Sequence, residues 1–175
     1  MPTFVECSEM KDVVKKLHEE RGDLFGYADP EMILCGLRTD KNQPKTQTWV
    51  LKIEGVSGSK TLLNQDIKYV IWAFDETWRA LDEKHKLAYV ANMLIRIKRP
   101  TAEDYVKMSR SGEDFEWGKL VRPDISDFTA FIRAFGIDWD DPNTQIPDIL
   151  DPRTKLEMGL DQVNDTSEFE ENSLL

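Results

Sequence analysis

Residues 55–61, Gly-Val-Ser-Gly-Ser-Lys-Thr, are the segment most suggestive of phosphate binding, because two glycines precede Lys60 and Thr61. A P-loop has the order G-x-x-x-x-G-K-[ST], in which the second glycine directly precedes the lysine and consecutive backbone amides surround the phosphates. Here Ser59 separates Gly58 from Lys60, and no helix pattern follows. The segment is therefore interpreted as a turn that connects two strands.

Other side chains capable of chemistry are few or unspecific. His18 and His85 are the only histidines, and no Ser-His-Asp order accompanies them, so both are interpreted as surface residues of helices rather than as bases. Cys7 and Cys35 have neither disulfide-framework nor zinc-knuckle spacing, and reduced thiols are expected. The 33 Asp and Glu residues are too many for a catalytic pair to be recognised.

The elements that would position any site have a mixed α+β pattern. Three β-prone runs predict a small sheet of about three strands, at residues 32–37, 48–53 and 67–74. The last run is apolar on both faces and is expected to lie centrally in the sheet. Apolar residues at helical spacing predict helices at residues 8 to about 22, 82–97, 102–108 and 123–135. In the second of these, the buried stripe is expected to be Leu87, Val90, Ala91, Leu94 and Ile97.

The order of these elements resembles the phage metallopeptidase family of zincin-like proteins. A long β-prone run is followed by Trp-x-x-Leu, by a helix, and by a Pro-Asp-x-x-x-Phe helix that ends in Phe-Gly, over about Asp12 to Trp139. In that family the first helix carries A-L-L-x-H-E-L-x-H, and a later H-D-V-x-E-F segment leads to Y-G-x-W. The matching segments here are 88–96, 123–128 and 135–139. The resemblance implies a zincin-like α+β core.

The chemistry of the family's motif is missing from the matched segments. In H-E-x-x-H, two histidines one helical turn apart bind Zn²⁺ and the glutamate activates the metal-bound water. The resemblance places Asn92-Met93-Leu94-Ile95-Arg96 on this motif, and Pro123 at the position of a third ligand. An amide, a thioether and a permanent cation neither hold zinc nor accept a proton from water. Because the two histidines of the chain are far apart, no shift of register restores the pair.

Two interpretations of Asn92 and Arg96 stay open at this point. In one, they form the polar face of a surface helix. In the other, Arg96 occupies the vacated metal position and pairs with Asp124 or Asp127, which would keep the two helices docked without zinc.

Charge is concentrated at the end of the chain. Of the formal net charge of −10, residues 138–175 contribute −9, with 11 acidic residues against Arg153 and Lys155. The remaining residues are nearly neutral, so no basic field for nucleic acid is present. Residues 140–175 are expected to be a largely extended or disordered acidic tail, whose first part Ile146, Ile149 and Leu150 could pin to the body.

These observations predict two parts, a metallopeptidase-like α+β domain at 1–139 and the acidic tail at 140–175. The predicted function is that of a non-catalytic phage or mobile-element protein that binds a host or phage protein, with no cofactor, metal, nucleic acid or membrane. The longest apolar run, Tyr69–Phe74, is too short to span a bilayer, and a cytoplasmic location in the host is expected. The alternatives are an acidic inhibitor or DNA mimic directed at a host nucleic-acid-binding or defence protein, and a hydrolase that uses another site.

Overall fold

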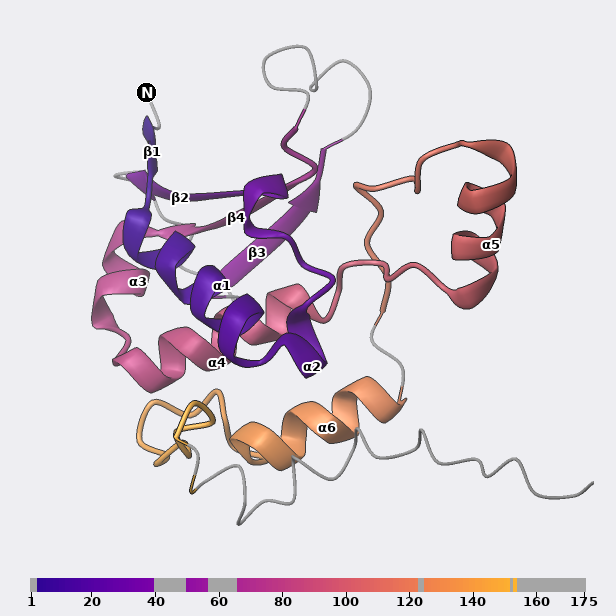
Figure 1. Cartoon of the computed structure of the whole chain (residues 1–175). Helices are drawn as coiled ribbons and strands as arrows, with labels where there is room; N and C mark the ends of the chain where they lie inside the picture. Colours follow the sequence, from indigo (N-terminus) through magenta and orange to yellow (C-terminus); the bar gives the residue numbers. More distant parts are fainter. Residues whose placement is uncertain (1–2, 40–49, 57–65, 123–124, 152, 154–175) are drawn as a thin grey trace, which may run out of the picture.

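The sheet is mixed and has four strands in the computed structural model, which describes residues 3–39, 50–56, 66–122, 125–151 and 153 (Figure 1). The strands are β1 (Thr3–Glu6), β2 (Ile33–Thr39), β3 (Leu51–Gly55) and β4 (Tyr69–Phe74), in the spatial order β1-β2-β4-β3. Strands β2 and β4 are parallel, and the two outer strands pair antiparallel with them. The predicted α+β class and the central position of β4 are confirmed.

The strand that the sequence did not predict is β1. All four of its side chains are exposed, so it carries no alternation of buried and exposed residues. Period-two alternation is the signal on which a strand prediction depends. The sheet therefore has one more strand than the three expected.

The predicted helices are present, together with shorter ones between them. They are α1 (Ser8–Glu20), α2 (Gly22–Phe25), the 3₁₀ helix η1 (Pro30–Met32), α3 (Asp75–Ala80), α4 (Glu83–Leu94), α5 (Ala102–Ser111) and α6 (Ile125–Phe135). Cys7 caps α1, its thiol accepting a hydrogen bond from the Met10 amide.

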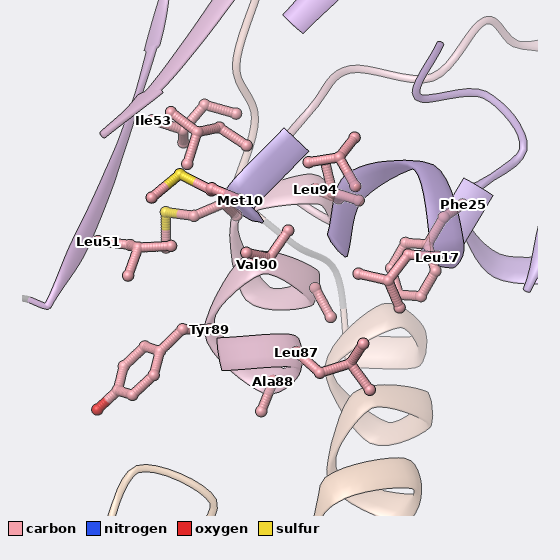
Figure 2. Packing of buried hydrophobic residues seen from close by; sticks show 14 of the residues in the cluster. Met10, Leu17, Phe25, Leu51, Ile53, Leu87, Ala88, Tyr89, Val90 and Leu94 are labelled. Carbon is pink, nitrogen blue, oxygen red and sulfur yellow. The ribbon is translucent and has the colours of Figure 1, made fainter. Parts of the chain in front are cut away.

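The main core lies between one face of the sheet and helices α1 and α4. In β4, the residues on this face are Tyr69, Ile71 and Ala73, and the register places Ile53 and Leu51 of β3 opposite the last two. Figure 2 shows Met10 of α1 beside Val90 and Leu94 of α4 and the two β3 side chains. All five residues of the predicted apolar stripe are buried.

On the other face of the sheet, β4 presents Trp72 and Phe74, whose rings meet edge to face at 5.7 Å. The guanidinium of Arg38 lies 4.8 Å from the centre of the Trp72 ring. Trp72 is buried, as the sequence predicted.

Residues 97–121, here called the arm, leave the body directly after α4 and return to it (Figure 1). The arm is closed at its base by an antiparallel bridge between Ile97 and Leu120. The amide of Lys98 donates to the Lys119 carbonyl at 3.1 Å, and the amide of Val121 donates to the Arg96 carbonyl at 2.8 Å. The arm carries α5, which has no buried residue.

Residues 138–151, here called the strap, follow α6 and pack against the body. Ile146 and Ile149 belong to the hydrophobic core and Leu150 is partly buried against it, so the expectation that these residues pin the start of the tail is confirmed. Residues 154–175 lie outside the described part, and the division of the chain at residue 139 stays a prediction. No helix in the described residues is long and apolar enough to cross a membrane.

Candidate functional site

The positions that the resemblance assigns to the H-E-x-x-H motif lie at the C-terminal end of α4. Asn92 and Met93 are buried in the last turn, 7% and 6% exposed. Helix α4 ends at Leu94, so Arg96 lies beyond the helix and is exposed. The interpretation of these residues as the polar face of a surface helix is therefore wrong for Asn92.

Arg96 and Asn92 bind each other. The Nη2 atom of Arg96 donates a hydrogen bond to Oδ1 of Asn92 at 3.2 Å. The two positions that the resemblance assigns to the motif histidines are thus joined by a guanidinium and the amide oxygen that accepts from it. A guanidinium is always charged and has no lone pair to offer a metal ion.

The arm brings the third motif segment toward the same place. Because the amide of Val121 donates to the carbonyl of Arg96, the chain lies beside Arg96 shortly before it reaches Pro123. Pro123, Asp124 and the side chain of Asp127 are outside the described part of the structure. The proposed pairing of Arg96 with Asp124 or Asp127 therefore stays a prediction.

These residues do not fit the zinc ion that the family resemblance implies. A structural or catalytic zinc site needs three or four imidazole, thiolate or carboxylate ligands. Within the described ranges, no three His, Cys, Asp or Glu side chains are grouped so that they could hold a metal ion. No hydrolytic step through a metal can be derived from the motif positions of this chain.

His85, at the other end of α4, is buried rather than on the surface, and the sequence interpretation of this residue is wrong. Only 2% of it is exposed. Its Nδ1 lies 2.7 Å from Oδ2 of Asp82, and its Nε2 lies 2.8 Å from the carbonyl oxygen of Asp141 in the strap. A carbonyl only accepts hydrogen bonds, so Nε2 donates to Asp141, and Nδ1 faces the Asp82 carboxylate.

Asp82 is held in its ionised form by the same contacts. Its Oδ1 accepts from the His85 amide at 2.9 Å, which makes it the N-cap of α4. This hydrogen bond, together with the nearby imidazole, lowers the pKa of the Asp82 carboxyl below its ordinary value. In a capping box, the N-cap residue is followed three positions later by a polar residue that binds it. Asp82 and His85 have this spacing, so the sequence contained a signal for their contact.

His85 therefore has a structural role that involves the strap. Its Nε2 has the Asp141 carbonyl as a partner and is not directed at a nucleophile. Four residues further along α4, the hydroxyl of Tyr89 donates to the Asp140 carbonyl at 3.4 Å, and the Tyr89 ring lies 4.9 Å from that of Trp139. The side of α4 that carries His85 and Tyr89 thus contacts the strap in two successive turns of the helix.

Of the remaining candidates of the sequence, the two cysteines are buried thiols. Cys7 and Cys35 are free and buried, and burial raises the pKa of Cys35 to about 12, so its thiol stays protonated. Residues 57–61 of the glycine-containing segment lie outside the described part. A small apolar cavity next to Ile95 is lined by aromatic and aliphatic side chains, and its only charged lining residue is Arg99.

The fold defines an α+β protein in which a buried helix packs against a four-stranded mixed sheet, and the described residues contain no group of three His, Cys, Asp or Glu side chains that could hold a metal ion. A comparison with known families gives the particular group: residues 2–147 match the family described as "Putative phage metallopeptidase", and the chain belongs to this family. No curated protein and no solved structure matches the chain.

Proposed function

We propose that this chain is a non-catalytic member of the phage metallopeptidase family that acts by binding another protein. The observation that carries the proposal is the hydrogen bond from Arg96 to Asn92, because it connects the two positions at which the family motif has histidines. A fixed positive charge at this point opposes the binding of a divalent cation. Met93, at the position of the general base, cannot accept a proton.

The retained framework supports binding rather than turnover. The chain keeps the core, the capped helix α4 and the arm that returns to its end. The elements of the scaffold are therefore kept, whereas the positions assigned to the metal ligands and the general base carry Asn92, Arg96 and Met93. A host or phage protein is the proposed partner, and a cytoplasmic location belongs to the same proposal.

The first test is metal analysis and a peptidase assay on the full chain purified without chelator. We expect less than stoichiometric zinc and no turnover. The matched control is the variant Asn92→His/Met93→Glu/Arg96→His/Pro123→His, which restores the motif and is expected to gain zinc if the register is right. Stoichiometric zinc together with turnover in the unaltered chain would overturn the proposal.

The second test asks which part of the chain binds. A cut at residue 139 is unsuitable because it removes Ile146 and Ile149 from the core. A chain that ends at Arg153 keeps both residues and lacks the region that holds most of the acidic tail. We expect this shortened chain to capture the same partner as the full chain, whereas loss of the partner would favour the acidic inhibitor or DNA mimic.

A further inference from the structure

Helix α5 of the arm exposes an apolar face that the described part of the molecule does not cover. Ala102, Tyr105, Val106 and Ser109 follow one another at offsets of 0, 3, 4 and 7, which places them on one side of the helix. Tyr105 is 59% exposed and Val106 is 48% exposed. No residue of α5 is buried.

Among the described residues, several exposed apolar side chains belong to the arm, two on α5 and two at its base. Seven large hydrophobic residues are exposed among those described, and four of them belong to the arm: Tyr105, Val106, Leu120 and Val121. Single exposed apolar residues are ordinary on a protein surface, but a group of them often marks an interaction site.

The helix is capped at both ends by its own residues. Thr101 accepts from the Asp104 amide at 3.2 Å, and the Asp104 carboxylate accepts from the Thr101 amide at 2.9 Å, which completes a capping box. At the other end Gly112 adopts the left-handed conformation, with a φ of 68°, that commonly ends a helix. A preformed helix loses little conformational entropy when it binds.

The charges beside the apolar face determine which occupant fits. Glu103 and Arg110 are seven residues apart and therefore lie on the same flank of the face. Neither makes an ion pair in the described part of the structure. We propose that α5 pairs antiparallel with α5 of a second copy of this chain. With a two-fold axis between Val106 and Lys107, Glu103 of each copy then lies beside Arg110 of the other.

Antiparallel pairing is favoured over parallel pairing by these charges. In a parallel pair the two-fold axis runs along the helices, so the flank with Glu103 and Arg110 lies on opposite sides of the two helices and these charges do not meet. Helix α5 has 10 residues and is therefore about 15 Å long, so the interface is at the small end of the size range. We expect a weak, reversible dimer. The inference is independent of the proposed function.

The experiment is sedimentation equilibrium of the full chain over a concentration series up to about 0.5 mM. We expect the unaltered chain to show a monomer–dimer equilibrium. Each of the charge reversals Glu103→Arg and Arg110→Glu should raise the dissociation constant about tenfold, because two ion pairs become two repulsive contacts. The double variant Glu103→Arg/Arg110→Glu restores opposite charges and should return the dissociation constant close to its original value. Lys15→Glu on α1, which makes the same charge change as Arg110→Glu far from the arm, should leave it unchanged.

Two results would overturn the inference. One is a chain that stays monomeric throughout the series, and the other is a double variant that associates as weakly as the single variants. Tyr105→Ala tests the apolar face independently and should also weaken the dimer. Circular dichroism of each variant checks that it is folded, which is expected because the altered residues are exposed.

Discussion

At the scale of single residues, the contact between Arg96 and Asn92 is the observation on which the proposed loss of catalysis rests. The two side chains satisfy each other, and the amide that remains buried at position 92 has a partner for its oxygen. Buried polar atoms are costly when they lack a partner. The hydrogen bond therefore lowers the cost of keeping Asn92 buried at the end of α4.

Asp82 provides a prediction about pH. Its pKa is lowered in the folded protein, first by the hydrogen bond from the His85 amide. A lowered pKa stabilises the fold above the ordinary pKa of the carboxyl, 3.8, and this stabilisation is lost as the pH falls through the folded value. Since 61% of the Asp82 side chain is exposed, solvent screens the effect, and we expect a contribution below about 1 kcal/mol.

The measurement is the free energy of unfolding of the unaltered chain and of Asp82→Asn, from denaturant titrations between pH 3 and 7. The asparagine side chain of this variant keeps an oxygen that can accept from the His85 amide, but it carries no charge. The unaltered chain should be the more stable of the two near neutral pH, and the difference should shrink below pH 3.8. A difference that grows on acidification would contradict the prediction.

At the scale of elements, the base of the arm fits closely against the end of β3. A Cβ atom added to Gly55 would lie 1.9 Å from the carbonyl oxygen of Gly118. The amide of Gly118 also donates to the hydroxyl of Tyr69 at 3.0 Å, which ties the arm to the central strand. The arm thus approaches the sheet backbone to backbone, which is possible because residue 55 has no side chain.

We predict that Gly55→Ala lowers the free energy of unfolding by about 1–3 kcal/mol, because one backbone segment must move away from the other. Gly22→Ala is the matched control, since a Cβ there would meet no atom within 4 Å. Thermal or denaturant unfolding of both variants measures the difference. Equal stability of the two variants would show that the base of the arm is looser than the structure indicates.

At the scale of the whole molecule, the strap makes part of the acidic segment a component of the folded body. Trp139 packs between Tyr89 and Phe131, with ring centres 4.9 and 5.1 Å away, and Ile149 is fully buried. The negative charge near the start of this segment therefore lies on the surface of the body.

Two truncations should differ in stability for this reason. A chain that ends at residue 139 loses Ile146 and Ile149, and burial of one such side chain contributes about 1.5–3 kcal/mol. A chain that ends at Arg153 keeps both. We expect a clearly lower melting temperature for the shorter chain and little change for the longer one, measured by calorimetry. Similar melting temperatures for the two truncated chains would contradict the importance of the strap.

The sequence by itself determined the α+β class, three of the four strands, the four main helices and the family, because these depend on local periodicity and on the order of elements. It also excluded an H-E-x-x-H motif, since the two histidines, His18 and His85, are far apart in the sequence. Strand β1 could not be predicted, because its exposed side chains carry no pattern.

Only the tertiary structure decided the surroundings of α4. The sequence shows one apolar stripe, which packs on α1 and the sheet, and it leaves His85 and Asn92 as apparent surface residues. A residue distant in the chain binds His85, because the Asp141 carbonyl of the strap accepts from its ring. Asn92 is buried although its partner, Arg96, is only four residues away. The contact of His85 depends on where the strap backbone is placed, and local residue spacing contains no record of that placement.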